Sequence, residues 1–331
     1  MTAADGLGEF ELIARVFAPL AADGALGLTD DAAFYRPRPG LDLVLTKDEV
    51  VSGVHFFADD AWDAVARKAL RVNLSDLAAK GAAPVGYLLA LGLPKDFTGE
   101  QIDALGAGLA ADQATYGISL YGGDTVRSPA GLTLSVTAIG EVRQGGMVRR
   151  GGAQVEEIIV VTGTIGDAAL GLSLRLDPAL SDRLGLSAEH RGHLLDRYLL
   201  PQPRGALASA VADCASGGMD ISDGLVGDLG KMAAASGVAI EIDADRVPLS
   251  TAAKAAVSAD PRLLAVALTG GDDYELALSI PRDKLDTFLA AAAAQGVGAT
   301  AIGRVRSGEG VAVRGDHPAL TELGSGSYRH F

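Results

Sequence analysis

Aspartates recur beside glycines or just after short apolar runs at several separate points of the sequence. Mg²⁺ prefers carboxylate oxygens together with water and substrate phosphate, so aspartates that converge on one point suit metal-assisted phosphate chemistry. The aspartates in this context are Asp30, Asp31, Asp48, Asp76, Asp124, Asp220, Asp223, Asp272 and Asp273. The set indicates a site that holds magnesium and a phosphorylated small molecule.

Each of these aspartates, taken alone, also has a structural explanation. Aspartate is a good N-cap before a helix and a good turn residue beside glycine. Asp76 is the exception, because it falls inside a predicted helix, where aspartate is a poor helix former and no cap is needed. The run Asp220-Ile-Ser-Asp223 suits helix capping and cation binding equally well.

Glycines near these aspartates supply a second element. Gly122 and Gly123 would let backbone N–H groups approach a phosphate without obstruction by a Cβ atom. The segment 163–167 links a predicted strand to a helix, whose N-terminus either faces an anion or forms an ordinary turn. Arg150 either reaches a phosphate or is simply exposed.

The composition narrows the classes of partner. A net charge of −14 argues against nucleic acid, whose binding depends on Lys and Arg contacts to phosphate. An acidic protein that binds a polyanion needs a divalent metal as intermediary, although acidity can also serve solubility alone. The lone Cys214, the lack of a signal-peptide pattern and the shortness of every apolar run predict a cytoplasmic protein.

The elements that must position these residues follow from hydrophobic periodicity. Helices are expected over residues 10–20, 61–80, 99–116, 166–176, 187–200, 205–215, 222–236 and 282–295. Strands are expected over residues 41–45, 85–93, 118–121, 132–142, 158–162, 238–242, 276–280, 300–305 and 311–313. A Gly- and Arg-rich stretch over 144–152 predicts a boundary between domains 1–145 and 146–331. Strands and helices alternate in both halves, which predicts a mixed α/β, or α+β, fold.

Other motifs carry little weight. The sequence has no P-loop, and the glycine pattern at 106–111 lies inside a predicted helix, where a dinucleotide fingerprint does not belong. His190 and His193 lie on a charged helix with no third ligand nearby, so we expect them on a solvated face. Cys214 is expected to be a packing residue.

Several segments, in order along the chain, resemble the thiamine-monophosphate kinase family. The segments are Thr46-Lys-Asp-Glu-Val-Val-Ser-Gly-Val-His-Phe56, Lys68-Ala-Leu-Arg-Val-Asn-Leu-Ser-Asp-Leu-Ala-Ala-Lys-Gly-Ala82, Gly122-Gly-Asp-Thr125, Thr162-Gly-Thr-Ile-Gly-Asp167, Met219-Asp-Ile-Ser-Asp-Gly-Leu225, Gly270-Gly-Asp-Asp-Tyr-Glu-Leu276 and Gly326-Ser-Tyr-Arg-His-Phe331. The resemblance covers nearly the whole chain.

The resemblance implies a homodimer of two-domain subunits in the superfamily of aminoimidazole ribonucleotide synthetase and selenophosphate synthetase. The N-terminal domain would bind ATP and metal and pair its sheet in the dimer, and the C-terminal domain would complete the site. The γ-phosphate of ATP would pass to thiamine monophosphate, giving thiamine diphosphate and ADP.

The resemblance also assigns roles to residues. Magnesium would be held by Asp30, Thr46, Asp48, Asp76, Asp124 and Asp220. ATP would be contacted by Gly123, Asp124, Arg150, Ser222 and Asp223, and thiamine monophosphate by His55, Asp272 and Tyr328. No residue is expected as a general base.

Two departures from the family pattern leave alternatives open. Lys47 stands where the family often has Ser or Thr, and Asp272 stands where Glu is usual. Another synthetase of the superfamily that activates a substrate oxygen with ATP is one alternative, although no Cys near the amino terminus supports selenophosphate synthetase. A nucleotide-binding sensor that has lost catalysis is the other.

Overall fold

The structure is a computed structural model that describes residues 8–317 and Leu320. Contacts between residues divide the chain into two compact units. The first unit comprises Met1–Leu77 and Ala82–Gly145, and the second comprises Ala78–Gly81 and Gly146–Phe331. Each unit combines a sheet with helices, so the predicted mixed α/β fold is confirmed.

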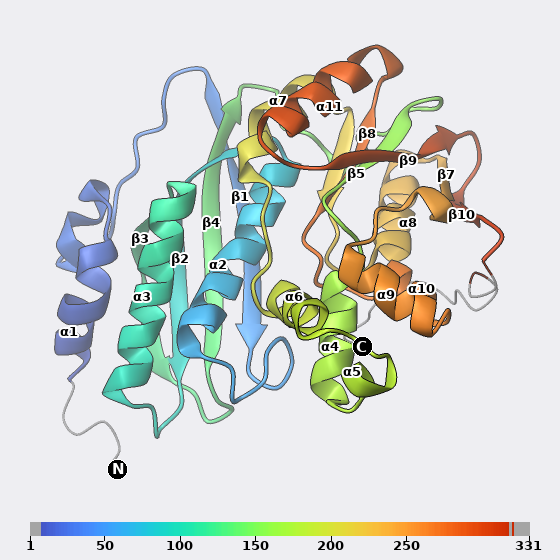
Figure 1. Ribbon diagram of the computed structural model, residues 1–331. Coiled ribbons are helices and arrows are strands. Elements are labelled where there is room, and N and C mark those ends of the chain that lie inside the picture. Colours follow the sequence, from blue (N-terminus) through green and yellow to red (C-terminus); the bar gives the residue numbers. More distant parts are fainter. Residues whose placement is uncertain (1–7, 318–319, 321–331) are drawn as a thin grey trace. The chain divides into compact units, whose positions relative to one another are not determined.

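The first unit contains a four-stranded sheet. Its strands are β1 (Leu41–Val51), β2 (Ala83–Leu93), β3 (Ser119–Arg127) and β4 (Thr133–Arg143), in the order β1-β4-β2-β3. β4 pairs antiparallel with both β1 and β2, and β3 lies parallel to β2 at the edge. The long helices α2 (Trp62–Ala79) and α3 (Gly99–Tyr116) cover one face of this sheet (Figure 1).

Local sequence explains the limits of α3. Thr98 accepts a hydrogen bond from the Gln101 backbone, and the Gln101 side chain accepts one from Thr98, which forms a capping box. Gly117 ends the helix in the left-handed conformation, with φ of 67°. Buried Asp112 on α3 binds Arg71 of α2 through two hydrogen bonds of 2.6 and 2.9 Å, so an ion pair joins the two helices.

The glycines at 122 and 123 lie beyond the strand that the sequence predicted over residues 118–121. They continue β3, which extends to Arg127. A Cβ atom on Gly123 would lie 1.8 Å from the Leu89 carbonyl oxygen, and Gly122 has φ of 153°. Glycine is therefore required here because β2 and β3 approach each other closely at a bulge, not because the chain turns.

The second unit contains a six-stranded sheet with helices on both faces. Its strands are β5 (Ile158–Thr162), β6 (Gly217–Asp220), β7 (Ala239–Asp243), β8 (Leu276–Ile280), β9 (Ala299–Arg306) and β10 (Gly310–Arg314), in the order β10-β7-β9-β5-β8-β6. Its helices are α4 (Asp167–Leu176), α5 (Leu180–Arg183), α6 (Ala188–Leu199), α7 (Ala208–Cys214), α8 (Leu225–Ser236), α9 (Thr251–Ala259), α10 (Leu263–Thr269) and α11 (Leu285–Ala294).

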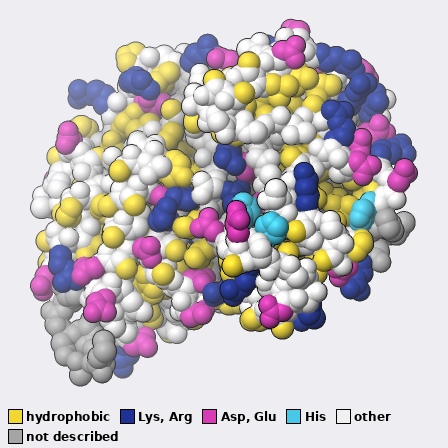
Figure 2. All heavy atoms as spheres, viewed as in Figure 1, with side chains coloured by type: hydrophobic (Ala, Val, Ile, Leu, Met, Phe, Trp, Pro, Cys, Tyr) yellow, Lys and Arg dark blue, Asp and Glu magenta, His cyan; other side chains and the backbone are white. Residues whose placement is uncertain are grey.

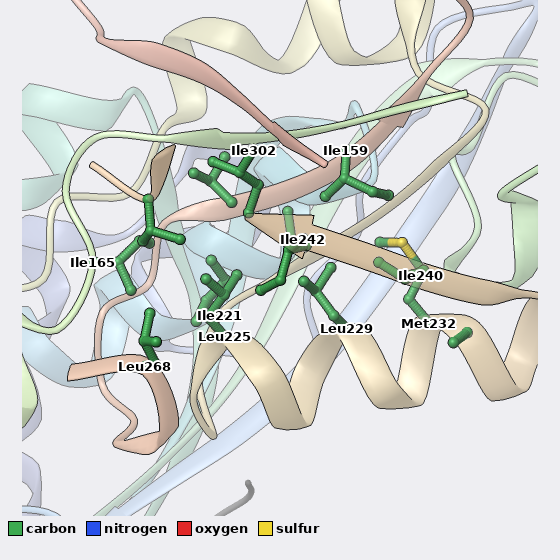
Figure 3. Packing of buried hydrophobic residues seen from close by; sticks show 14 of the residues in the cluster. Ile159, Ile165, Ile221, Leu225, Leu229, Met232, Ile240, Ile242, Leu268 and Ile302 are labelled. Carbon is green, nitrogen blue, oxygen red and sulfur yellow. The ribbon is translucent and has the colours of Figure 1, made fainter. Parts of the chain in front are cut away.

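Alternation along β5 separates two hydrophobic clusters. Ile159 and Val161 pack with the residues of α8, whereas Ile158 and Val160 pack with those of α7 and α11. Figure 3 shows Leu225, Leu229 and Met232 of α8 facing the isoleucines of the sheet. Two-sided burial explains why β5 is a continuous apolar run and not an alternating one.

Most predicted elements are present, with three differences. The helix expected over residues 10–20 is divided into α1 (Glu9–Leu12), a π-helical segment Ile13–Phe17 and a 3-10 turn Ala18–Leu20, which contains Pro19. Helices α5, α9 and α10 and strand β6 were not predicted from the sequence. β1 continues through Thr46 and Asp48 to Val51, so both site candidates lie within a strand.

Candidate functional site

A cleft of about 610 Å³ opens in the first unit and brings together three of the predicted site residues. Asp30, Gly123 and Asp124 line it, together with Tyr35 and Tyr121. The rings of the two tyrosines pack edge to face, with centroids 5.8 Å apart. The cleft therefore combines carboxylates with aromatic and apolar walls, the usual composition of a small-molecule site.

A buried glutamate fixes the chain segment that forms one wall of this cleft. Glu141 of β4 accepts hydrogen bonds from the Tyr35 hydroxyl and from the Arg38 Nε, the latter at 2.8 Å. Burial and the hydrogen bond to Glu141 raise the pKa of Tyr35 to about 12, so its hydroxyl keeps its proton at neutral pH. Residues 29–38 have no regular secondary structure, and these bonds hold them on the sheet.

Three other candidates meet where β1 contacts α2. The Thr46 hydroxyl donates a hydrogen bond to Asp76 Oδ2 of α2. The Asp48 backbone N–H donates to Asn73 Oδ1 at 3.0 Å, and Asn73 is completely buried. Asp76 thus binds β1 through its side chain, and this contact explains why an aspartate, a poor helix former, lies inside α2. Asn73 was not predicted, although its place three residues before Asp76 on the same helix is a signal.

His55 lies in the turn after β1. Its Nδ1 accepts a hydrogen bond from the Val51 N–H at 3.1 Å, and the buried Lys68 donates to its carbonyl oxygen at 3.0 Å. The imidazole is half-buried and its orientation is set by the bond at Nδ1. Lys47 pairs with Glu49 at 2.6 Å, and both side chains are about half exposed.

The second unit holds a second group of candidates on the turn after β6. Asp220 is the last residue of β6 and is buried, and Ser222 and Asp223 follow it. The N–H groups of Ser222 and Asp223 both donate to Asp228 Oδ2 at 2.9 Å. The fully buried Asp228 thus occupies these amides, so a contact from Ser222 to a nucleotide would come from its hydroxyl.

A lysine links the two carboxylates of this turn. Lys231 donates to Asp228 Oδ1 at 2.8 Å and to Asp223 Oδ2. Burial raises the pKa of Asp228, and the hydrogen bond from Lys231 opposes that rise. Burial lowers the pKa of Lys231, but the hydrogen bonds that it donates to Asp223 and Asp228 outweigh this effect and raise the pKa, so the lysine stays charged.

Asp272 lies against that turn. Its N–H donates to the Ser222 carbonyl oxygen at 2.9 Å, and the N–H of Tyr274 donates to Ile221 at 2.8 Å. The predicted nucleotide side and the predicted substrate side are therefore neighbours in this unit. Both Asp272 and Tyr274 have positive φ, 71° and 50°, a conformation that costs non-glycine residues roughly 1–2 kcal/mol each.

A carboxylate of the chain occupies the N-terminus of α4. Asp273 is buried, and its Oδ2 accepts a hydrogen bond from the Gly166 N–H at 2.8 Å. Burial raises the pKa of Asp273 well above its ordinary value, and the hydrogen bond from Gly166 lowers it in part. The structure thus resolves the alternatives for the segment 163–167, because Asp273 takes the place there that an anionic ligand would need.

Three side chains that were not predicted, those of Glu275, Arg197 and Arg204, form an ion-pair group at the turn that carries Asp272 and Asp273. Glu275 is fully buried and binds Arg197 at 2.9 Å and Arg204 at 2.6 Å. His193 is exposed, as expected, and its Nε2 also lies 3.1 Å from Oδ2 of the buried Asp167, a contact that was not predicted. Charged residues spaced along a helix predict exposure, and only the tertiary structure reveals their buried partners.

Two candidates have little structural context. Arg150 begins a short 3-10 turn, is exposed, and its carbonyl oxygen accepts a hydrogen bond from Ser236 at 3.4 Å. Tyr328 lies outside the described residues. The Arg150 side chain is open to solvent, so both alternatives that the sequence left for it remain open.

The candidate ligands suit magnesium in their chemistry. Every proposed donor is a carboxylate or hydroxyl oxygen, the type that Mg²⁺ prefers. Across residues 8–317 and Leu320, however, no three acidic, histidine or cysteine side chains form a ready-made metal site. Magnesium in nucleotide sites typically uses one or two carboxylates plus water and phosphate, so the donors present fit a metal that arrives with its nucleotide.

The surface shows no large separation of charge on the face that is visible in Figure 2. Acidic and basic side chains lie among hydrophobic ones on that face. Several exposed pairs neutralise each other, such as Glu156 with Arg282 and with Arg306, both at 3.1 Å. In the part of the chain that the structure describes, no helix is long and apolar enough to cross a membrane.

Comparisons with known proteins place the chain in a family. The N-terminal domain described as AIR synthase related protein matches residues 29–142, and the corresponding C-terminal domain matches residues 154–316. A thiamine-monophosphate kinase of Caulobacter vibrioides is 42% identical over 308 residues, which cover 92% of this chain and 85% of that protein. The chain belongs to the thiamine-monophosphate kinase family.

Solved structures agree with this family. A crystal structure of thiamine-monophosphate kinase from Stenotrophomonas maltophilia K279a is 39% identical, with a TM-score of 0.82, over 96% of this chain and 98% of that one. A structure described as AaThiL complexed with AMPPCP and TMP is 30% identical, with a TM-score of 0.77, over 100% and 99% of the two chains. The resemblance that the motifs indicated is confirmed.

Proposed function

We propose that this chain transfers the γ-phosphate of ATP to thiamine monophosphate in a magnesium-dependent reaction, giving thiamine diphosphate and ADP. Family membership supports the chemistry, and a relative whose structure is described with AMPPCP and TMP supports both substrates. The observation on this chain that carries the proposal is the hydrogen bond from Asp272 N to Ser222 O. It brings Asp272, which is proposed to bind the phosphate acceptor, next to Ser222, which is proposed to bind the nucleotide.

The acceptor needs no general base. A phosphate monoester has a second pKa near ~6, so thiamine monophosphate is already a dianion at neutral pH. One of its oxygens attacks the γ-phosphorus, and the bond from that phosphorus to the oxygen that leaves with ADP breaks. The obstacle is repulsion between two anions, so catalysis depends mainly on positioning and electrostatics.

The chain's residues would divide these tasks. Magnesium would be held by Asp30, Thr46, Asp48, Asp76, Asp124 and Asp220, and when bound it would neutralise the phosphates. Gly123, Arg150, Ser222 and Asp223, with Asp124, would contact ATP, while His55, Asp272 and Tyr328 would orient thiamine monophosphate. The Val51 N–H donates to Nδ1 of His55 and so sets the orientation of that ring.

We further propose a homodimer through the first unit's sheet, in the cytoplasm. Leu43 and Leu45 of β1 and Leu88 of β2 are 42%, 65% and 42% exposed, while neighbours such as Val44 and Leu89 are buried. Because side chains alternate along a strand, Leu43 and Leu45 share one face of β1, and the register through Thr137 of β4 puts Leu88 on that same face. Sedimentation of the wild type and of Leu45→Lys tests this, and a monomeric wild type would contradict the dimer.

The function is tested by incubating the protein with ATP, Mg²⁺ and thiamine monophosphate. Formation of thiamine diphosphate and ADP in equal amounts is expected, with no transfer when magnesium is chelated. Bound but unconsumed ATP would contradict the proposal and support a sensor. ATP hydrolysis that depends on a different acceptor would support another synthetase of the superfamily.

A further inference from the structure

The turn Gly270–Glu275 has a backbone that its own residues do not favour. Asp272 and Tyr274 both adopt positive φ, although neither is glycine. Such residues persist only where their surroundings determine the conformation. The contacts that impose this shape therefore bear on where the Asp272 carboxylate lies.

Backbone contacts provide part of the restraint. The N–H groups of Asp272 and Tyr274 donate to Ser222 and Ile221, and the Ile221 N–H donates to the Glu275 carbonyl oxygen. These bonds fix the turn on its neighbour but leave its other side to be held by side chains. Glu275 is the residue at which both kinds of contact coincide.

The Glu275 carboxylate joins four parts of the unit. It accepts hydrogen bonds from the Thr162 hydroxyl at 2.8 Å, from Arg197 at 2.9 Å and from Arg204 Nε at 2.6 Å. Thr162 is the last residue of β5, and its hydroxyl oxygen accepts the Leu276 N–H at 2.8 Å, so the carboxylate is tied to β5 directly and to β8 through Thr162. Its side chain has no exposed surface, whereas those of Arg197 and Arg204 are 9% and 20% exposed.

Gly163 shows that the neighbouring turn is built around this carboxylate. A Cβ atom on Gly163 would lie 2.0 Å from Glu275 Oε1, and Gly163 itself has φ of 57°. Arg197 also donates to the Asp273 carbonyl oxygen, at 3.4 Å, inside the turn that carries Asp272. Glu275 thus fixes Arg197, which itself binds the turn that carries Asp272.

We propose that Glu275 is a positioning residue, which acts through Arg197 and Arg204 to hold Asp272 where it meets the phosphate acceptor. The assignment rests on the proposed function of Asp272. Glu275 itself does not touch the substrate. Its loss should loosen the turn and weaken acceptor binding more than it alters the rate at saturation.

The test compares Glu275→Gln with Glu157→Gln in the full-length protein. Glu157 is a matched control, because it is also buried and accepts hydrogen bonds, from Ser216 at 2.7 Å and Ser279 at 2.6 Å. It precedes β5, at the opposite end of that strand from Thr162. Both variants remove a buried carboxylate, but only Glu275→Gln alters the turn Gly270–Glu275.

Two readouts separate positioning from general stability. In Glu275→Gln we expect amide exchange across residues 270–275 of the ligand-free protein to accelerate at least about tenfold. We also expect KM for thiamine monophosphate to rise about tenfold, with kcat changed less. Glu157→Gln should change neither, even where it lowers the melting temperature equally. Unchanged exchange and KM in Glu275→Gln, or equal changes in both variants, would overturn the proposal.

Two milder variants cover the case in which Glu275→Gln does not fold. Glu275→Asp keeps the charge but shortens the side chain, and Arg204→Lys keeps the charge but removes the paired geometry at a partly exposed position. Each should show the same two changes at a smaller scale, and their absence in both would contradict the proposal. A wild type that fails to make thiamine diphosphate would sink the proposed function while leaving the exchange result intact.

Discussion

The two units hold their candidate residues in different ways. In the first unit, Asp48 and Asp124 lie on strands and are exposed, and the strand ladder fixes their backbone. In the second unit, Asp223 and Asp272 lie on turns, which have no ladder. The buried Asp228 carboxylate accepts the amides of Ser222 and Asp223 instead, and the amides of Asp272 and Tyr274 donate to backbone carbonyl oxygens of that same turn.

This difference has a consequence for what mutations should do. A carboxylate on a strand can be neutralised with little loss of structure, so its removal tests ligand binding directly. A carboxylate that anchors a turn contributes to both shape and charge, so its removal changes stability and site geometry together. The following predictions separate the two behaviours, from the largest expected effect to the smallest.

The largest effect is expected from neutralising a candidate metal ligand in either unit. Asp48→Asn and Asp220→Asn should each lower kcat by about 10³-fold or more, equivalent to about 4 kcal/mol of transition-state stabilisation. The melting temperature of Asp48→Asn should hardly change, because the side chain is exposed. Steady-state kinetics at saturating magnesium measure this, and a near-normal rate would remove these residues from the metal site.

Asp42→Asn is the control for Asp48→Asn. Asp42 lies on the same strand, and its Oδ2 accepts the Gly145 N–H at 2.8 Å. This substitution should leave kcat within about twofold of the wild type, since only one hydrogen bond, from a backbone amide to a surface carboxylate, is at stake. A comparable loss in both variants would indicate a general effect on β1.

The next effect concerns a buried ion pair that lies away from the candidate residues of the first unit. Arg71→Met leaves Asp112 buried and poorly paired, so the free energy of unfolding should fall by about 3–5 kcal/mol. Arg183→Met removes an exposed pair with Asp177 and should lower the free energy of unfolding far less. Urea unfolding measures both, and equal losses would contradict the role of burial.

Asp273 should give the second unit a dependence of stability on pH. Burial raises its pKa, so the folded protein binds this proton more tightly than the unfolded one. The contribution is present at acid pH and is lost as pH rises from about 3.9 through the folded pKa, at up to about 1.4 kcal/mol per pH unit. Asp273→Asn lacks this loss, so its unfolding free energy relative to the wild type should increase with pH.

Urea unfolding of wild type and Asp273→Asn between pH 4.5 and 8 checks this sign. A difference between the two proteins that stays constant across the range would show that Asp273 binds no more protons in the folded state than in the unfolded state there, which would contradict the raised pKa.

The smallest effect is expected at Lys47. Its pair with Glu49 is exposed, so Lys47→Ala should change stability by less than about 1 kcal/mol. The hydrogen bond from Lys47 lowers the pKa of Glu49, and that carboxylate remains charged without it at neutral pH. If Lys47 contacts phosphate, KM for ATP will rise severalfold, whereas an unchanged KM would limit the lysine to its surface pair.

Local patterns were sufficient for much of the fold. The capping residues Thr98 and Gln101 and the terminal Gly117 define α3, and the predicted helix over residues 99–116 has the same limits in the structure. Helices α9 and α10 escaped prediction because their sequences are short and rich in alanine, valine and leucine. Packing against the second unit's core, and not periodicity, stabilises helices of that length.

The sequence by itself determined the family, the mixed α/β class and the aspartates worth testing, because motif order and residue type are local properties of the chain. Only the tertiary structure decided which amides those aspartates meet. Asp273 and Glu275 looked like turn and strand residues, yet they are buried against Gly166, Arg197 and Arg204. Burial and charge pairing join residues far apart in sequence, so no local pattern contains them.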